Sequence, residues 1–324
     1  MTLLASLESL RITHWTLNLL LELAEQVSLV DKPRYIRAMS TPHPDAELLQ
    51  TFIRRSLSED IGPGDYTSLA TIPAGRRGRA RLLVKDHGVL CGMPIAKAVF
   101  NYLDPSCEIE DLLSEGDDIS PGQEAFYVEG PIRTLLGGER LVLNTMQRLS
   151  GIANMSRVFA KAVEGTNAKV LDTRKTTPQL RFLEKYAVVV GGCHNYRDGL
   201  YDRIMIKDNH VDGAGGMREA IEGVHEYLKA NNLDLMMTVE VRNLEELDTV
   251  LSIGNIQRIM LDNFELSDLK TAVKTINGRH ESEASGGVNL KTIRPIAETG
   301  VDYISVGALT HSAQSIDLSL KMMS

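Results

Sequence analysis

The second half of this chain alternates short apolar runs with helical patterns, and this repeat constrains the fold more than any other feature. Six runs have the length and composition of buried parallel strands, and they lie at 170–178, 202–210, 235–243, 257–264, 280–288 and 301–312. Helical patterns separate the later runs, at 217–230, 243–254, 266–276 and 290–300. From residue 235 onward the strands recur roughly every 22–24 residues, which is the size of one strand–helix unit. Repeated units predict an α/β fold with a parallel sheet, and their number favours a barrel over a doubly wound sheet.

Most of these runs end in ionisable residues, or in glycine and serine. In an α/β barrel the C-terminal ends of the strands build the active site, so these residues are expected to meet at one mouth. The cations are Arg174, Lys175, Arg197 and Lys207, and the acids include Asp172, Glu240 and Asp262. A single strand-end lysine is more often solvated or salt-bridged, and Glu240 could simply pair with Arg242. Because several consecutive strands end in the same way, a shared functional site explains these residues better than separate surface salt bridges. Cations gathered at one mouth repel one another, so they predict an anionic ligand.

Two further features point to a phosphorylated substrate. Glu240 and Asp262 stand well apart in the sequence, and one or two carboxylates are what Mg²⁺ takes from a protein when phosphate and water complete its shell. The loops at 285–288 and 305–312 follow the last two strands, and their glycine and serine residues let backbone N–H groups approach a phosphate. The residues therefore predict a barrel enzyme that binds a phosphorylated substrate, Mg²⁺ and a second, strongly anionic molecule.

The first half has a different organisation. A helix is predicted from residue 44 to the turn at 62–64, a hairpin over 79–92 and a helix over 93–103, followed by two strands. We assign residues 39–148 to an α+β domain, and residues 149–324 to the barrel with a C-terminal helix. Residues 1–38 lack the basic start and the cleavage site of a signal peptide. We expect translation to start at Met39; a peptide from residues 1–38 in a mass spectrum of the natively expressed protein would contradict this.

Composition argues against several functions. The net charge is −8, whereas general nucleic-acid binding needs a basic surface. No apolar run reaches the length that crosses a bilayer, so no membrane partner is expected. The three cysteines, Cys91, Cys107 and Cys193, are an odd number without metal-binding spacing, which favours a cytoplasmic location.

Taken together, the motifs resemble those of the quinolinate phosphoribosyltransferases, the decarboxylating nicotinate-nucleotide pyrophosphorylases. The similarity runs from about Leu48 to Leu320 with the motifs in matching order. It is carried by EDIGPGDYTS (59–68), ERLVLNTMQRLSGIAN (139–154), DTRKTTPQLRFLEKYAVVVGG (172–192), DRIMIKDNHV (202–211), VEVRNLEEL (239–247), IMLDN (259–263), EASGGVN (283–289) and ISVGALTHS (304–312). The resemblance implies an incomplete TIM-like barrel preceded by an α+β sandwich domain, in a homodimer or larger assembly. It also implies that quinolinate and phosphoribosyl pyrophosphate give nicotinate mononucleotide, pyrophosphate and CO₂, a step of NAD biosynthesis.

The resemblance implies roles for individual residues as well. The catalytic set would be Lys175, Lys207, Glu240 and Asp262. The quinolinate pocket would be lined by Arg174, Lys175, Tyr196, Arg197 and Lys207, with Arg140 reaching in from the partner subunit. Glu240 and Asp262 would lie by the ribose and the Mg²⁺-pyrophosphate. The candidates for binding the 5′-phosphate are Ser285, Gly286, Gly287, Gly307 and His311.

One position departs from the family pattern, which commonly has a histidine just before the pocket arginine. Here Tyr196 precedes Arg197, and a tyrosine hydroxyl can donate to a carboxylate but carries no positive charge at neutral pH. Because of this departure, one alternative is that the protein is a paralogous phosphoribosyltransferase that acts on another heterocyclic acid. A second alternative is an aldolase-type barrel, in which Lys207 at the end of a buried strand forms a Schiff base.

Overall fold

A computed structural model describes residues 44–323 of the chain, so the predictions for residues 1–38 lie outside the described residues. Six parallel strands form the sheet of the second half, in the order β6-β11-β10-β9-β8-β7. They are β6 (Lys169–Leu171), β7 (Ile204–Ile206), β8 (Met237–Val241), β9 (Arg258–Asp262), β10 (Glu281–Ser285) and β11 (Tyr303–Ser305). The first strand pairs with the last, while β6 and β7 do not pair with each other in the described part of the chain. The predicted parallel α/β barrel is confirmed, and it has one opening, between β6 and β7.

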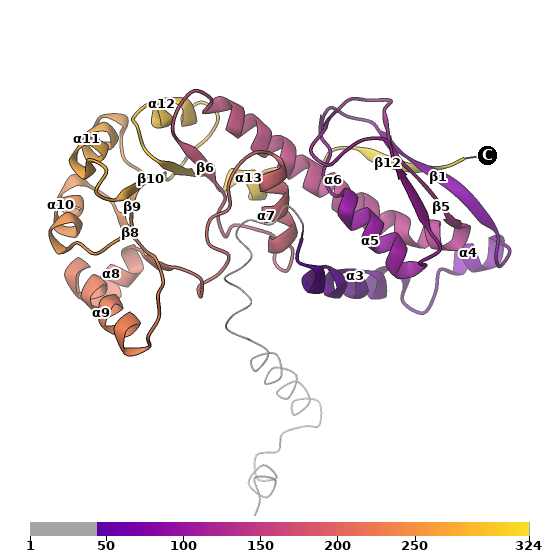
Figure 1. The fold of residues 1–324 in the computed structure, drawn as a ribbon, viewed down its shortest axis with the longest axis horizontal. Helices are drawn as coiled ribbons and strands as arrows, with labels where there is room; N and C mark the ends of the chain where they lie inside the picture. Colours follow the sequence, from indigo (N-terminus) through magenta and orange to yellow (C-terminus); the bar gives the residue numbers. More distant parts are fainter. Residues whose placement is uncertain (1–43, 324) are drawn as a thin grey trace, which may run out of the picture. The chain divides into compact units, whose positions relative to one another are not determined.

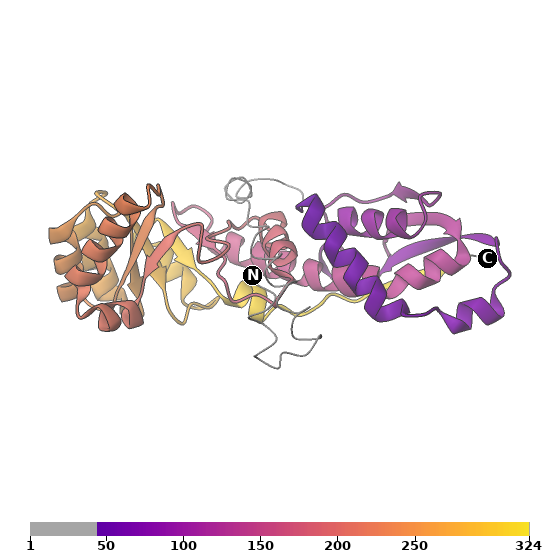
Figure 2. The ribbon, with the colours of Figure 1, turned by 90° about the horizontal axis from the view of Figure 1, so that it is seen from below.

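The helices that follow strands β7 to β10 lie on one side of this sheet (Figures 1 and 2). They are α8 (Asp208–Ala214), α9 (Met217–Ala230), α10 (Leu244–Ile253), α11 (Leu266–Ile276) and α12 (Ile293–Ala297). The short α13 (Ala308–His311) follows β11 and contacts α6 and α7 instead. Their apolar positions explain this packing: Leu269, Ala272 and Ile276 of α11 recur at helical spacing and are buried. Asn243 begins α10 by accepting a hydrogen bond from the backbone N–H of Glu246, as a helix-capping side chain does.

The first half folds around a four-stranded antiparallel sheet in the order β12-β1-β5-β3. Its strands are β1 (Arg77–Val84), β3 (Glu108–Asp111), β5 (Glu124–Pro131) and β12 (Leu318–Met322), and its helices are α3 (Ala46–Ile61), α4 (Tyr66–Thr71) and α5 (Met93–Leu103). A separate two-stranded ladder joins β2 (Gly88–Val89) to β4 (Asp118–Ile119). The predicted hairpin over 79–92 is therefore wrong, because β1 pairs with β5 and β12 rather than with β2.

The predicted C-terminal helix is also wrong. Residues 318–322 form β12, which returns from the barrel half and pairs with β1, with Leu320 opposite Leu82 (Figure 1). Leu318 and Leu320 are buried while Ser319 between them is less so, and this period of two is that of a strand. The last strand of the chain thus completes the sheet of the first half.

A long helix, α6 (Ile132–Ala162), contains the predicted boundary at residue 148 and packs against elements of both halves. Gly151 on α6 has a close-approach role, because a Cβ there would lie 2.0 Å from the backbone oxygen of Gln314. The chain can therefore cross α6 on its way from the barrel to β12. A further helix, α7 (Arg181–Val190), follows β6 and precedes β7 in the sequence. It packs against α6.

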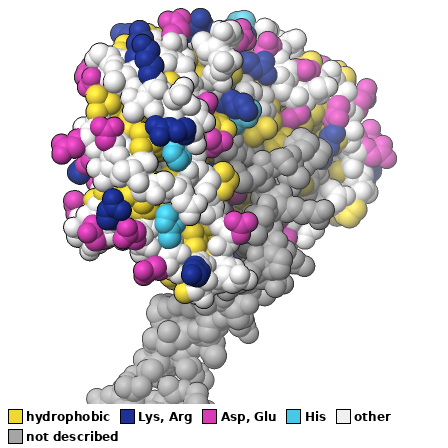
Figure 3. Space-filling model, turned by 60° about the vertical axis from the view of Figure 1, so that its left-hand side comes forward, with side chains coloured by type: hydrophobic (Ala, Val, Ile, Leu, Met, Phe, Trp, Pro, Cys, Tyr) yellow, Lys and Arg dark blue, Asp and Glu magenta, His cyan; other side chains and the backbone are white. Residues whose placement is uncertain are grey.

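The face of the barrel half shows no single block of one charge. Figure 3 brings the barrel side forward and shows positive and negative side chains interspersed over that face. None of the helices within residues 44–323 has the length and apolarity needed to cross a bilayer.

Candidate active site

The C-terminal ends of the parallel strands carry the predicted acids on one face of the sheet. Glu240 of β8 lies opposite Met260 of β9, and Asp262 lies opposite Ser285 of β10. Residues that pair across strands, and residues two apart along a strand, project to the same face. Since the alternate residues, such as Val239, belong to the core under the helices, Glu240, Asp262 and Ser285 project into the barrel.

Lys207 and Glu240 form an ion pair at this mouth. Lys207 follows β7, and its ammonium group contacts the Glu240 carboxylate on the neighbouring strand β8. The Glu240 side chain is 7% exposed and the Lys207 side chain 41% exposed, so the lysine closes the solvent side of a nearly buried carboxylate. Arg242 pairs with Glu246 instead, at 2.5 Å, and the suggested pairing of Glu240 with Arg242 is therefore wrong.

Two guanidinium groups near the end of β6, those of Arg174 and Arg197, form no ion pair in the described part of the chain. Arg197 is buried, and burial together with the nearby charge of Arg174 lowers its pKa. The Nε atom of Arg174 is buried without a hydrogen-bond partner, and neither arginine forms an ion pair within the described residues. Like charges held together in this way are stabilised when an anion binds between them, and the arrangement suits a ligand with one or two carboxylates.

Lys175 meets the loop after β11. A Cβ built on Gly307 would lie 3.0 Å from both the Nε2 of His311 and the Cδ of Lys175. The hydroxyl of Thr310 donates to the carbonyl oxygen of Lys175 at 2.8 Å, which ties the two loops together. The absence of a side chain at residue 307 lets a lysine and a histidine converge beside exposed backbone, as a phosphate site requires.

The loops after β9 and β10 are also in close contact. Gly286 has φ +97°, and a Cβ there would lie 2.2 Å from the side-chain oxygen of Asn263. The backbone N–H of Asn263 donates to the carbonyl of Ser285 at 2.8 Å. Only glycine fits this conformation and this approach, so Gly286 fixes Asp262 beside Ser285 and Gly287.

A buried ion pair that the sequence did not predict supports the β6 end of the mouth. Lys185 of α7 donates to Asp172 at 2.5 Å and to the carbonyl of Tyr196 at 2.9 Å. The backbone N–H of Tyr196 donates to the same Asp172 oxygen at 2.8 Å. Burial raises the pKa of Asp172 to about 6, although Lys185 acts in the opposite direction. The sequence signal that could have indicated this pair is the apolar setting of Lys185, which lies two residues from both Leu183 and Ala187 in a largely apolar helix.

Tyr196 points into the barrel rather than out of the mouth. It is 4% exposed, and its hydroxyl shares a 2.6 Å hydrogen bond with that of Thr238 on β8. The ring lies under the guanidinium group of Arg258, 5.0 Å from its centroid, and Arg258 also pairs with Glu283 at 3.0 Å. This interior polar cluster was not predicted, because charged residues at the start of a strand are usually read as solvated.

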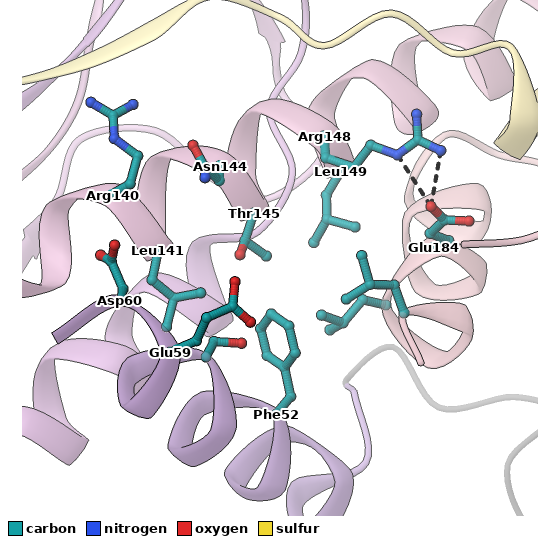
Figure 4. A pocket seen from close by; sticks show the side chains of 13 residues that line it. Phe52, Glu59, Asp60, Arg140, Leu141, Asn144, Thr145, Arg148, Leu149 and Glu184 are labelled. Atoms are coloured by element: carbon teal, nitrogen blue, oxygen red, sulfur yellow. Dashed lines mark hydrogen bonds and ion pairs between the residues drawn. The ribbon is translucent and has the colours of Figure 1, made fainter. Parts of the chain in front are cut away.

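Arg140 stands apart from these residues. It lines a cavity of about 240 Å³ between α3, α6 and α7, which Figure 4 shows with Arg140 and Asp60 at one end and the Arg148–Glu184 ion pair at the other. Phe52, Leu141 and Leu149 form its apolar part. Arg140 is exposed and has no ion pair within the described part of the chain.

The acids at the mouth provide few donors for a magnesium ion. Within residues 44–323 no group of three His, Cys, Asp or Glu side chains could hold a metal on its own. Glu240 is engaged with Lys207, and Asp262 accepts a hydrogen bond from the Asn263 amide at 2.7 Å. One or two carboxylates on one face fit Mg²⁺ that brings phosphate and water as its other ligands, and do not fit an all-protein cage.

The mouth of the parallel barrel brings together two arginines without ion pairs in the described residues, two carboxylates and glycine-rich loops. These features are typical of a two-domain α/β-barrel enzyme that acts on anionic substrates. Comparison with family models identifies the family. The model for the quinolinate phosphoribosyl transferase N-terminal domain matches residues 65–150, and that for the C-terminal domain matches residues 152–321. The chain belongs to the quinolinate phosphoribosyltransferase family.

Individual relatives agree with this assignment. The chain is 42% identical to the chloroplastic nicotinate-nucleotide pyrophosphorylase [carboxylating] of Arabidopsis thaliana over 86% of this chain and 84% of that protein. It is 43% identical to quinolinate phosphoribosyltransferase [decarboxylating] 1 of Nicotiana glauca, over 91% and 86% of the two chains. Among solved structures, NadC from Streptococcus pyogenes superposes with a TM-score of 0.82 at 36% identity, over 88% of this chain and all of that one. The incomplete barrel and the preceding sheet domain are thus those of the family.

Proposed function

We propose that this protein transfers the phosphoribosyl group of phosphoribosyl pyrophosphate to quinolinate and releases CO₂, giving nicotinate mononucleotide and pyrophosphate. The observation that carries the proposal is the pairing of two neighbouring cations: Arg197 is buried, the Nε atom of Arg174 is buried without a hydrogen-bond partner, and neither arginine forms an ion pair within the described residues. A molecule with two adjacent carboxylates supplies the charge that this pair needs. Each charge-assisted hydrogen bond contributes roughly 1.5–3 kcal/mol, so several of them separate a diacid from a monoacid.

The residues of the mouth suit the steps of this reaction. Arg174, Arg197 and Lys207 hold the carboxylates and aim the pyridine nitrogen at the ribosyl carbon, and the carbon–pyrophosphate bond breaks as the new carbon–nitrogen bond forms. Glu240 and Asp262 stabilise the positive charge that develops on the ribose. The ribosylated ring nitrogen is cationic, so it draws off the electron pair left when the neighbouring carboxylate departs as CO₂, and that carbon then takes up a proton.

Asp262 and Glu240 are the residues that would hold Mg²⁺, together with the pyrophosphate of the substrate. A bound Mg²⁺ supplies Lewis-acid neutralisation of the leaving pyrophosphate. Lys175, Gly307 and His311, with Ser285, Gly286 and Gly287, form the proposed phosphate-binding loops. The convergence of Lys175 and His311 on Gly307 supports this assignment.

A paired turnover assay tests the reaction. The protein is given phosphoribosyl pyrophosphate and Mg²⁺ with either quinolinate or nicotinate, and mononucleotide and CO₂ are followed. We expect product with quinolinate and none with nicotinate. Turnover with neither acid would instead favour a paralogue that acts on another heterocyclic acid.

Replacing Gly307 with alanine is expected to raise the KM for phosphoribosyl pyrophosphate about 10-fold, because the new Cβ pushes Lys175 and His311 apart. The KM for quinolinate should change less than about twofold. The matched control is Gly223→Ala on α9, where a Cβ meets nothing within 4 Å, and it should behave like the wild type. Equal changes in both KM values for Gly307→Ala would contradict a phosphate role for this loop.

We extend the proposal to a homodimer or larger assembly in which Arg140 completes the neighbouring active site. Its support is the exposed guanidinium group of Arg140, which lies beside the cavity and forms no ion pair with any residue of 44–323. Inactive Arg140→Ala and Lys207→Ala variants, unfolded and refolded together, should recover up to about a quarter of the wild-type activity if the assembly is a dimer. Half of the dimers would be mixed, and each would hold one site with both residues intact. No recovery, with mixed dimers present by mass spectrometry, would refute the sharing.

A cytoplasmic location is also proposed, on the strength of three free cysteines in the described residues. The Arabidopsis relative carries the word chloroplastic in its name, so location varies in the family. Imaging the whole chain fused at its C-terminus to a fluorescent protein would decide this, and organellar fluorescence would refute it.

A further inference from the structure

Tyr196 lies on a segment that acts as an extra edge of the barrel. Residues 193–197 follow α7 and run beside β6, where His194 forms a parallel bridge with Leu171. The backbone N–H of His194 donates to Val170 at 2.9 Å, and its carbonyl accepts from Asp172 at 3.0 Å. Since β6 is the strand at the opening of the barrel, this segment stands between β6 and β7.

The side chain of Tyr196 crosses that opening. Its hydroxyl bonds to Thr238 of β8, at 2.6 Å, and its ring packs in one apolar cluster with Leu171, Met205 and Met260 of strands β6, β7 and β9. The guanidinium groups of Arg203 and Arg258 lie 5.3 Å and 5.0 Å from the ring centroid. Both distances are in the range of cation–π attraction, so the ring is held from several strands at once.

The hydroxyl of Tyr196 is already engaged and is poorly placed to bind a ligand. Thr238 is fully buried and already shares a hydrogen bond with it. Burial and the charge of Glu283 raise the pKa of Tyr196 to about 12, so the phenol is neutral at working pH and brings no charge to a carboxylate. The next residue, Arg197, carries the charge that a carboxylate needs.

We propose that Tyr196 is a positioning residue, which joins the segment beside β6 to Thr238 and so fixes Arg197 beside Arg174 for the dicarboxylate. The inference rests on the proposed function, because it assumes that Arg197 binds quinolinate. Two like charges repel each other, and Arg197 forms no ion pair within residues 44–323, although Asp202 and Glu283 attract it from a longer distance. The anchored backbone of residue 196 supplies the restraint that an ion pair would provide.

Tyr196→Phe and Thr238→Val each remove the shared hydrogen bond from one side. We expect each to raise the KM for quinolinate about 5–10-fold, with kcat and the KM for phosphoribosyl pyrophosphate within about twofold of wild type. The double variant should be no worse than the more impaired single variant, since both changes break the same link. Thr238→Ser keeps a hydroxyl and should restore the wild-type KM, and Tyr227→Phe on the exposed face of α9 is the matched control.

Three results would overturn the inference. If Tyr196→Phe weakened quinolinate binding while Thr238→Val did not, Tyr196 would be a direct ligand, because fully buried Thr238 cannot touch substrate. If neither variant changed the KM for quinolinate, the link would not position Arg197. If both lowered the melting temperature and impaired all kinetic parameters alike, the link would serve stability only. Failure of the proposed function would appear separately, as a wild-type protein that does not turn over quinolinate.

Discussion

Replacing Lys185 with methionine is expected to lower the free energy of unfolding by about 3–5 kcal/mol and to abolish most quinolinate turnover. The side chains of Lys185 and Asp172 are 3% and 0% exposed, so the change leaves a buried carboxylate without its cation. It also removes the hydrogen bond from Lys185 to the carbonyl of Tyr196, which precedes Arg197. Chemical denaturation and steady-state kinetics measure the two effects. The matched control is Arg218→Met, whose partner Glu222 is exposed and whose loss should cost at most about 1 kcal/mol.

The pH dependence of Lys185→Met gives an independent test. The folded-state pKa of Asp172 is already raised above its ordinary value, to about 6, and removing Lys185 removes an influence that lowers it. A carboxyl group with a raised folded pKa stabilises the fold below its unfolded pKa, and this contribution is lost as pH rises through the folded pKa. The deficit of the variant should therefore be largest well above pH 6, shrink as pH falls towards 6, and level off below it, where Asp172 is protonated in the wild type as well. A deficit that stayed constant between pH 5 and 8 would show that charge burial is not its cause.

A double variant separates stability from function at the same position. Asp172→Asn combined with Lys185→Met removes both charges, and an uncharged pair of similar volume should recover much of the lost stability. Activity should stay low, because the carbonyl of Tyr196 still lacks its donor and Arg197 its restraint. Full recovery of both would mean that this pair serves folding alone.

The parallel barrel and its mouth could be predicted because both depend on local signals. Strand length, the helical patterns and their spacing are readable along the chain, and parallel strands bring their C-terminal ends to one edge whatever their order. For this reason Glu240, Asp262 and Ser285 were predicted correctly to end strands that lie side by side. The helix at 93–103 was equally local, and α5 has these bounds.

The errors concern partners that are distant in sequence. The alternation in residues 318–322 is visible, but its partner β1 lies more than 200 residues away, and no local signal names it. The 79–92 segment has two apolar runs around a turn, yet β1 finds better partners in β5 and β12. No local sequence signal names Asp172 as the partner of Lys185, and only the tertiary fold brings the two side chains together. The sequence likewise shows that Tyr196 precedes Arg197, but it does not show that the side chain of Tyr196 points into the barrel.

The second large effect is expected at the Lys207–Glu240 pair. Lys207→Met should lower kcat/KM by at least about 100-fold, because it removes a cation from the mouth and leaves the Glu240 carboxylate, 7% exposed, without its partner. Lys207→Arg keeps the positive charge and should lose only about 10-fold, since its longer fork meets the carboxylate in a different geometry. Steady-state kinetics with both substrates measure this, with circular dichroism to verify folding.

These two variants also decide between the proposed reaction and a Schiff-base barrel. An amine that attacks a carbonyl cannot be replaced by a guanidinium group, so the Schiff-base mechanism predicts that Lys207→Arg is as inactive as Lys207→Met. An electrostatic role predicts the ranking wild type, arginine, methionine. Borohydride trapping of the wild type with carbonyl compounds should leave Lys207 unlabelled, because its side chain is engaged in the ion pair with Glu240; a stable adduct on Lys207 would reverse the assignment.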